Sequence, residues 1–479
     1  MLIVRARKIC LNICMKRIQI KNIKDKVGET VKLAGWVDVR RDHGKLIFID
    51  LRDASGKVQI VATPKSAEAR EIADAVRPEW VVEIEGDVKE RPENMVNPDL
   101  PFGDLEISVQ KMKILNEAKT PPFEIGTDGY GVGEEIRLKY RYLDLRRDRL
   151  QKNIRTRHGA AKYIRDYLSE RDFLEIETPI LTKSTPEGAR DFIVPSRLQK
   201  GKFYALPQSP QQYKQLLMAS GFEKYFQIAK CMRDEDTRSD RQPEFTQLDL
   251  EMSFVEKEDV MNLSEELVIG MIEKLAPEKK ITRTPFPRLP FKEVMEKYGT
   301  DSPDLREDKN NPNELAFCWV VDFPFFEKDE KGGWTFTHNP FSAPAEEHEE
   351  MLMRKENIGD IVATQYDLVL NGFEVAGGSI RNHRPEALKK VFEILGFAED
   401  GIEKNFGHML SAFEHGAPPH GGIAFGLDRI IAILENEPSI REVIAFPKTG
   451  DGRDLMMEAP SEISREQLDE LGIEIKRNA

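Results

Sequence analysis

The chain has 479 residues, of which 32% are charged and 40% hydrophobic, and its formal net charge is -13. This length allows two or three domains with full hydrophobic cores, and the acidity argues against a general nucleic-acid binder. No run of about 18 apolar residues occurs, so we expect no membrane span. The four cysteines include no pair at metal-finger spacing, which favours a reducing, cytoplasmic location.

The charge is unevenly distributed along the chain. Residues 1–60 contain 14 lysines and arginines against 6 acidic residues, which favours a basic N-terminal module that binds a polyanion locally. Chance clustering of lysines on a small domain is the alternative. Residues 1–14 lack the long apolar core and cleavage site of a signal peptide, so residues 1–16 are predicted to be a disordered extension or the product of a misplaced start.

Residues 17–115 show short apolar–polar alternations that are typical of strands. The expected strands are residues 31–39, 46–52, 58–62, 80–88 and 105–114, with a helix at 66–76. Three strands, a helix and two strands are the order of an OB-fold barrel, which commonly binds single-stranded nucleic acid. Residues 116–133, which include Pro121 and Pro122, are predicted to be a linker.

One aromatic side chain in this module is predicted to face outward. In the strand at 46–52, Ile47, Ile49 and Leu51 share one face, which leaves Phe48 among polar groups on the other. A base stacked on an aromatic ring contributes roughly 1–3 kcal/mol. The alternative is that Phe48 closes the end of the barrel.

Three segments of the remaining chain stand out. Within Phe173–Leu181 the alternation predicts a strand that ends at Pro179, and residues 421–434 form a glycine-rich strand that runs into an apolar helix. Between them, residues 225–229 and 245–251 are predicted to be the two strands of a hairpin. The charged run 231–251, which spans the loop and the second strand, carries three arginines and seven acidic residues. A solvated, salt-bridged turn is the alternative for this charged run.

In this order the three segments resemble motifs 1, 2 and 3 of class II aminoacyl-tRNA synthetases. Together with residues 207–215 (PQSPQQYKQ) and 373–381 (FEVAGGSIR), the chain is similar to bacterial-type aspartyl-tRNA synthetases of subclass IIb over residues 17–475. The resemblance implies an α+β fold: an N-terminal OB-fold barrel, then an antiparallel class II sheet flanked by helices in residues 134–479, opened by a basic helix at 134–157. It also implies a homodimer formed through the Pro179 strand.

The chain departs from the family in two places. Bacterial members usually carry an extra domain between motifs 2 and 3, whereas here residues 290–313 lead directly into the apolar run at 317–324. The family usually has two consecutive histidines where this chain has His338 and Asn339, so only His338 is assigned a role.

The resemblance implies an aspartate–tRNA ligase that uses ATP and Mg²⁺. In such a reaction the amino-acid carboxylate attacks the α-phosphate of ATP, so the protein positions two anions and neutralises charge without a covalent nucleophile. Expected partners are L-aspartate, ATP, tRNA-Asp and, for the relaxed form of the family, tRNA-Asn. His43 matches a histidine of the relaxed form and favours dual specificity.

The resemblance assigns roles to individual residues. The catalytic group is Arg233, Glu374 and Arg429. Aspartate is bound by Glu187, Ser209, Gln211, Lys214, Arg233, His338 and Arg381. ATP is bound by Arg233, Asp234, Glu235, Gln242, Glu374, Gly426, Leu427, Asp428 and Arg429. Mg²⁺ is held by Asp367 and Glu374, and the tRNA anticodon by Arg41, His43, Phe48 and Gln59.

Two alternatives remain beside this reading. An asparaginyl or lysyl relative is disfavoured because Lys214 and Arg381 suit a side-chain carboxylate and would repel a lysine ammonium. A catalytically silent RNA-binding paralogue is disfavoured because Arg233, Glu374 and Arg429 are all present.

Overall fold

The computed structural model describes residues 15–98, 100–184 and 188–476. The chain divides into two compact units, residues 1–131 and 132–479, and the dividing point falls inside the predicted linker. The N-terminal extension predicted for residues 1–16 lies almost wholly outside the described residues, as does Glu187.

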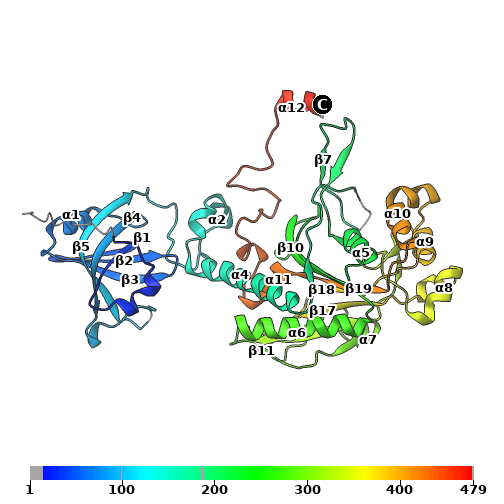
Figure 1. The fold of residues 1–479 in the computed structure, drawn as a ribbon, viewed down its shortest axis with the longest axis horizontal. Helices are drawn as coiled ribbons and strands as arrows, with labels where there is room; N and C mark the ends of the chain where they lie inside the picture. The colour runs from blue at the N-terminus through cyan, green and yellow to red at the C-terminus, as the bar shows by residue number, and fades with distance from the viewer. Residues whose placement is uncertain (1–14, 99, 185–187, 477–479) are drawn as a thin grey trace, which may run out of the picture. The chain divides into compact units, whose positions relative to one another are not determined.

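The first unit is a closed five-stranded barrel with the strand order β1-β2-β3-β5-β4 (Figure 1). Its elements are β1 (Thr30–His43), β2 (Leu46–Asp53), β3 (Gly56–Ala62), α1 (Ala67–Ala75), β4 (Val81–Glu90) and β5 (Leu105–Asn116). The predicted OB-fold and its order of three strands, a helix and two strands are therefore confirmed.

Alternation along the strands builds the barrel core. Ile47, Ile49 and Leu51 of β2 are fully buried, as the pattern predicts. The turn from β1 to β2 passes through Gly44, whose φ of +73° lies in the left-handed region that a two-residue hairpin turn needs at its first position. The loop therefore fixes the register in which Arg41 lies opposite Phe48.

The second unit is centred on an eight-stranded sheet with the order β12-β14-β17-β18-β19-β10-β9-β6 (Figure 1). Its strands are β6 (Leu174–Glu175), β9 (Lys224–Met232), β10 (Glu244–Ser253), β12 (Arg288–Pro290), β14 (Phe317–Val321), β17 (Gln365–Leu370), β18 (Phe373–Ile380) and β19 (His420–Gly426). All neighbours are antiparallel except the edge pairs β12–β14 and β6–β9. The predicted antiparallel class II sheet is confirmed.

One face of this sheet is covered by helices. The helices α4 (Asp148–Ser169), α6 (Lys257–Leu275) and α11 (Leu427–Leu434) contribute to one apolar cluster with the strands. Within β10 the side chains of Leu248, Leu250 and Met252 enter this cluster. Successive strand residues face opposite sides, so the residues between them are presented to the other face, where α5 lies against β10.

Further elements surround the sheet. The helices are α2 (Glu134–Lys139), α3 (Arg141–Asp144), α5 (Gln211–Ala219), α7 (Phe291–Tyr298), α8 (Glu349–Arg354), α9 (Pro385–Ile394), α10 (Glu399–Glu414) and α12 (Arg465–Leu471). The short strand pairs are β7 (Ile193–Pro195) with β8 (Phe203–Ala205), β11 (Lys280–Ile281) with β13 (Glu314–Leu315), and β15 (Phe326–Lys328) with β16 (Trp334–Phe336). The 3₁₀ turns are η1 (Ile20–Asn22), η2 (Lys24–Lys26), η3 (Glu93–Met95), η4 (Glu346–His348), η5 (Ile358–Asp360) and η6 (Ile440–Glu442).

Two predicted elements are wrong in extent. The strand expected from Phe173 to Pro179 is reduced to Leu174–Glu175, because this segment lies at the sheet edge and only these two residues pair with β9. The single helix expected at 134–157 is three helices, α2, α3 and the start of α4. The breaks allow arginines from separate turns to converge on the fully buried Asp144.

None of the helices in the described ranges is long and apolar enough to cross a lipid bilayer. Between the hairpin β9–β10 and strand β17, the connection passes through α6, α7 and short strands with no additional domain among the described residues.

Candidate active site

Two adjoining pockets lie on the face of the sheet that the odd-numbered residues of β10 present. They share four residues, Arg233, Gln247, Glu374 and Ala424. Gln247 comes from β10 and Ala424 from β19, which pair as neighbouring strands. Ligands in the two pockets can therefore both contact these four shared residues.

The first pocket is lined by most of the residues predicted to bind ATP. Its lining includes Arg233, Glu235, Gln242, Phe245, Glu374, Gly426, Asp428 and Arg429. The Arg233 guanidinium lies 5.1 Å from the centroid of the Phe245 ring, a cation–π contact. The only ring in this lining is that of Phe245, which our sequence reasoning did not single out although it lies directly on the predicted second strand of the hairpin.

Some polar groups that line this pocket have a donor or a charge that no neighbouring described residue uses. The Gln242 side-chain oxygen accepts from the Lys448 backbone N–H at 2.8 Å, whereas its buried Nε2 donates to no described residue. Arg429 donates to the Glu374 carbonyl and to Asp240 Oδ2 at 3.1 Å. Arg233 forms no ion pair with any residue in the described ranges, so its charge is available to an anion.

Three predicted ATP-binding residues have other surroundings. The Leu427 side chain is packed in the hydrophobic core. The buried Asp428 carboxylate accepts from Thr246 N at 2.8 Å and from Arg157, so its role is to hold α11 against β10 and α4. Asp234 does not line the pocket and lies 3.9 Å from Arg190. Asp428 nevertheless lines the first pocket, whereas Leu427 does not.

The second pocket has two buried cations in its wall, Lys214 and Arg381, which are 1% and 2% exposed. Arg381 donates to both carboxylate oxygens of Glu251 at 2.9 and 3.2 Å and to Ser379 Oγ at 2.7 Å. Lys214 Nζ lies 2.6 Å from Asp249 and 3.2 Å from Glu251. These four side chains form one buried cluster of two basic and two acidic groups, in which burial raises the pKa of Asp249 and the charge of Lys214 opposes the rise.

Sequence reasoning identified the two cations and missed the two acids. Asp249 and Glu251 occupy alternate positions of a strand whose other face is apolar, which is a signal of a buried polar face. Burial alone would raise the pKa of Glu251, but the charges of Arg381 and Lys214 lower that pKa below its ordinary value. Glu251 therefore stays ionised and holds both cations at the pocket.

The other predicted aspartate-binding residues also line this second pocket. Ser209, Gln211, Arg233 and His338 all do so, and Gln365 and Asn339 join them. Segments distant in sequence are therefore brought to one place by the antiparallel sheet and helix α5. Glu187 lies outside the described residues.

The predicted metal ligands Asp367 and Glu374 stand on a hairpin. The turn between β17 and β18 is Asn371-Gly372, with φ of +51° and +87°, the pair of left-handed residues typical of a tight hairpin. A Cβ placed on Gly377 would lie 3.0 Å from Asp367 Oδ1 and 3.2 Å from Glu374 Oε1. Both carboxylates thus approach one point beside a residue with no side chain.

The carboxylates of Asp367 and Glu374 lie close enough for their charges to interact. Burial raises the pKa of Asp367 to about 7; the charge of His338 opposes the rise and the carboxylate of Glu374 adds to it. His338 Nε2 lies 3.5 Å from Asp367 Oδ2. No group of three or more His, Cys, Asp or Glu side chains suited to a metal occurs in the described parts of the chain. A cation here needs further oxygen ligands, such as phosphates.

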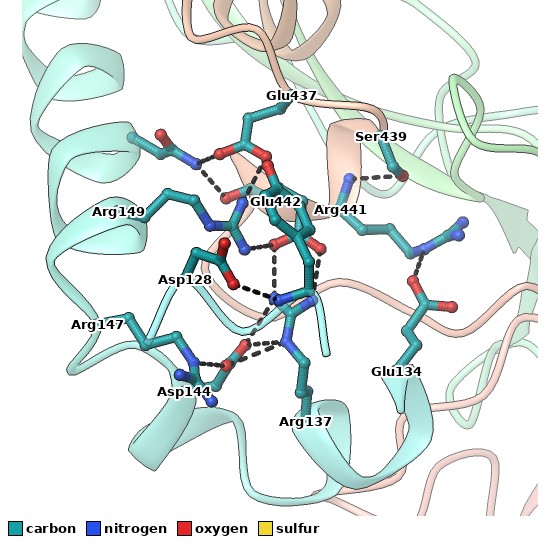
Figure 2. A network of polar contacts seen from close by, with 12 residues as sticks. Asp128, Glu134, Arg137, Asp144, Arg147, Arg149, Glu437, Ser439, Arg441 and Glu442 are labelled. Carbon is teal, nitrogen blue, oxygen red and sulfur yellow. Dashed lines mark hydrogen bonds and ion pairs between the residues drawn. The ribbon is translucent and has the colours of Figure 1, made fainter. Parts of the chain in front are cut away.

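A buried ionic network holds the segment that contacts the loop of the β9–β10 hairpin. Arg137 donates to Asp144 and to both oxygens of Glu442, at 3.1 and 2.6 Å, and Arg149 donates to Glu442 at 2.8 Å (Figure 2). Glu442 thereby fixes η6.

The segment at η6 then holds the hairpin loop. Ser439 Oγ and Ile440 N donate to the Ser239 carbonyl at 2.8 and 3.0 Å, and Arg441 donates to the Arg238 carbonyl at 3.2 Å. Ile440 itself lines the first pocket. The network therefore fixes the wall of the pocket that the charged loop forms.

The four residues predicted to bind an anticodon share one face of the barrel. Arg41 lies opposite Phe48, and Asp50 lies opposite Gln59. The ring of His43 meets the edge of Phe48 at a centroid distance of 5.4 Å. Phe48 is half-buried and is not among the residues of the barrel core, which counts against the alternative that it closes the barrel end.

Two of these residues already have partners on that face. Arg41 donates to both oxygens of Asp50 at 2.8 and 2.7 Å. Gln59, which is buried, donates to Glu106 at 3.2 Å. The face is thus a preformed polar surface around one aromatic ring.

Comparisons with known proteins agree with this architecture. A family model described as "tRNA synthetases class II (D, K and N)" matches residues 133–450, and one described as "OB-fold nucleic acid binding domain" matches residues 31–115. The "Aspartate--tRNA(Asp/Asn) ligase" of Rubrobacter xylanophilus is 42% identical over 573 aligned positions, covering 94% of this chain and 95% of that protein. The protein of the same name from Dictyoglomus turgidum is 44% identical, covering 94% and 96%.

The fold also matches solved structures. Asparaginyl-tRNA synthetase from Pyrococcus horikoshii, complexed with asparaginyl-adenylate, has a TM-score of 0.73 at 23% identity and covers 91% of this chain and 98% of its own. The alignment with the R. xylanophilus protein is longer than this chain's 479 residues. That relative therefore contains residues without a counterpart here, in line with the absence of a domain between the second and third motifs.

The two matched families, the full-length relatives and the paired pockets on a class II sheet lead to one conclusion. The chain is an aminoacyl-tRNA ligase and belongs to the class II synthetase family that comprises the aspartate, lysine and asparagine enzymes.

Proposed function

We propose that this protein is an aspartate–tRNA ligase that activates L-aspartate with ATP and transfers it to tRNA-Asp and tRNA-Asn. The observation that carries the proposal is the pair of buried cations, Lys214 and Arg381, in a pocket that shares Arg233 with the adjoining pocket. Relatives at 42–44% identity carry the name of this activity.

Selection of the amino acid follows from the chemistry of the pocket wall. A side-chain carboxylate can accept hydrogen bonds from the guanidinium of Arg381 and the ammonium of Lys214. The amide nitrogen of asparagine would bring a donor toward these donors and leave buried groups unpaired, and a lysine ammonium would add like charge. Glu251 and Asp249 hold the cations in place before the substrate binds.

Activation requires the α-carboxylate to approach the α-phosphate in line with the departing pyrophosphate. Arg233 belongs to both pockets, so one guanidinium can contact the substrate carboxylate and the phosphate to be attacked. Phe245 offers a ring, and Gln242 a buried donor, for the base and ribose. Arg429, at the start of α11, is placed to neutralise the outer phosphates.

Asp367 and Glu374 would hold Mg²⁺ together with phosphate oxygens. Their converging oxygens beside Gly377 fit a hard cation, whose charge would favour the ionised form of Asp367. When bound, the ion supplies positive charge that stabilises the phosphates during transfer.

The barrel face around Phe48 is proposed to bind the anticodon. The ring provides a stacking surface, and Arg41, His43 and Gln59 surround it with polar groups. His43 can donate or accept at the third anticodon base, the position at which tRNA-Asp and tRNA-Asn differ, which supports charging of both.

We further propose a homodimer in the cytoplasm. Strand β6 and the segment that follows it expose Leu174, Ile180 and Leu181, each between 42% and 52% exposed, at a sheet edge. Contiguous apolar side chains beside an open edge favour burial against another copy. The described cysteines, Cys231 and Cys318, are both buried, and no two cysteines of the sequence have metal-finger spacing, as suits a reducing compartment.

The test is ATP–pyrophosphate exchange by the purified protein with each amino acid in turn. We expect exchange with aspartate in the presence of Mg²⁺ and none above background with asparagine or lysine. Equal exchange with asparagine would refute the assignment of Lys214 and Arg381 to a carboxylate.

A further inference from the structure

Three side chains form a hydrogen-bonded chain that leads away from the amino-acid pocket. Gln211 lines the pocket, and its Nε2 donates to Gln215 Oε1 at 3.0 Å. Gln215 Nε2 then lies 3.2 Å from His420 Nε2, and His420 Nδ1 lies 2.7 Å from the Pro418 carbonyl oxygen. Gln215 and His420 are both 0% exposed, and neither lines the pocket.

The hydrogen bond between His420 and Pro418 fixes the direction of the other hydrogen bonds in this series. The Pro418 carbonyl can only accept, so His420 Nδ1 carries the proton and donates. Burial lowers the pKa of His420 below its ordinary value, which keeps the ring neutral. The Nε2 atom of a neutral ring protonated at Nδ1 is an acceptor, so it takes the hydrogen bond of the Gln215 amide nitrogen.

The orientation of the Gln215 amide in turn determines that of Gln211, which lines the pocket. With its nitrogen turned to His420, Gln215 presents its oxygen to Gln211, which lies one helical turn earlier on α5. That oxygen is satisfied only by the amide nitrogen of Gln211. The Gln211 oxygen is then the atom left for the pocket, and no described residue donates to it.

We propose that His420 is a positioning residue for the amino-acid substrate: through Gln215 it orients the Gln211 amide so that its oxygen accepts from the substrate α-ammonium. The proposal rests on the function proposed above. A reversed Gln211 amide would direct its NH₂ group at the substrate α-ammonium, and these two donors would repel each other. A glutamine without such a chain is free to adopt either orientation, since the two ends of the amide have the same shape.

The test compares aspartate with succinate, which has the same two carboxylates and no ammonium. Replacing Gln215→Met removes both hydrogen bonds and keeps an unbranched buried side chain. We expect the KM for aspartate in ATP–pyrophosphate exchange to rise about tenfold, the scale of one hydrogen bond to a charged group. The inhibition constant of succinate and the KM for ATP should each change by less than about twofold, since neither depends on the ammonium contact.

The matched control is Gln212→Met on the same helix. Gln212 is also buried, but its Nε2 has no hydrogen-bond partner among the described residues and it does not line the amino-acid pocket. This variant should leave all three constants unchanged. The variant His420→Phe, which alters only the far end of the chain, should reproduce the selective loss of aspartate affinity.

The outcomes separate the two proposals. KM and inhibition constants do not depend on the fraction of folded enzyme, so partial misfolding of a variant does not obscure the result. A parallel rise for aspartate and succinate, or an unchanged KM for aspartate, in Gln215→Met would overturn the inference. Absence of aspartate-dependent exchange in the unmodified protein would instead refute the proposed function.

Discussion

The wall of the amino-acid pocket and the outer face of the barrel each contain an arginine that donates to both oxygens of a carboxylate. In the pocket, Arg381 and Glu251 are 2% and 0% exposed at their side chains. On the barrel, the side chain of Arg41 is 42% exposed and that of Asp50 is 14% exposed. The same chemical pair therefore sits in two different dielectric surroundings.

The difference determines what each pair can do. In the pocket, removal of one partner leaves a buried charge without compensation, which typically costs about 3–5 kcal/mol. On the barrel, water and salt screen the pair, and exposed pairs typically contribute less than about 1 kcal/mol. In the function proposed above, selection of the amino acid would depend on buried charges, whereas binding at the barrel face would depend on ring stacking and adaptable hydrogen bonds.

The largest expected effect is that of Arg381→Leu. We expect the kcat/KM for aspartate in exchange to fall by at least about 150-fold, or about 3 kcal/mol, because the variant lacks the guanidinium and leaves Lys214 as the remaining cation beside the buried Glu251. The matched substitution Arg41→Leu should leave exchange unchanged. Similar losses in both variants would show that burial does not separate the two pairs.

A buried pair away from the pocket tests whether burial alone affects catalysis. Glu442→Gln should lower the free energy of unfolding by about 3 kcal/mol, since Glu442 pairs with Arg137 and Arg149 in the interior. The KM for aspartate of the folded variant should stay unchanged. Denaturant unfolding and exchange kinetics on one preparation check both statements, and a raised KM would mean that the network reaches the amino-acid pocket.

The pH dependence of the same variant has a definite sign. Burial alone would raise the pKa of Glu442, but hydrogen bonds and charge from Arg137 hold that pKa below its ordinary value. A lowered carboxyl pKa stabilises the folded state above the ordinary pKa, and this contribution is lost as the pH falls through the folded-state value. The difference in unfolding free energy between the unmodified protein and Glu442→Gln should therefore shrink below about pH 4.3. A difference that grows on acidification would contradict the network.

A smaller effect is expected on the barrel. Phe48→Ala should raise the KM for tRNA in aminoacylation by the equivalent of about 2 kcal/mol, the scale of one stacked base, with tRNA-free exchange intact. Val61 pairs with Phe48 across the sheet, and loss of the ring leaves the core cluster complete. An equal loss in exchange would mean that Phe48 supports the fold instead.

The smallest expected effect concerns His43. The unmodified protein should aspartylate tRNA-Asn within about tenfold of the rate for tRNA-Asp, a difference of about 1.4 kcal/mol. His43→Leu removes the donor and acceptor of the ring and should widen the preference for tRNA-Asp. Charging of tRNA-Asn hundreds of times more slowly than tRNA-Asp by the unmodified protein would refute dual specificity.

Much of the fold could be predicted from local patterns. Alternation along β2 and β10 and the glycine-rich strand before α11 each depend on a few consecutive residues, and all are present as predicted. The edge strand at Pro179 and the single helix at 134–157 were predicted too long. Their ends are determined by contacts with distant residues: the sheet edge in one case, and Glu442 and Asp144 in the other.

The sequence by itself indicated the chemistry of the candidate site, because its resemblance to a synthetase family pointed to motif residues such as Arg233, Lys214 and Arg381. Only the tertiary structure decided how those residues are held. Glu251 beneath Arg381 and Lys214, and His420 behind Gln215, come from strands and helices brought together by the sheet. The strength of a charge pair and the direction of a hydrogen bond depend on burial and on the neighbouring atoms, and no local stretch of sequence contains that information.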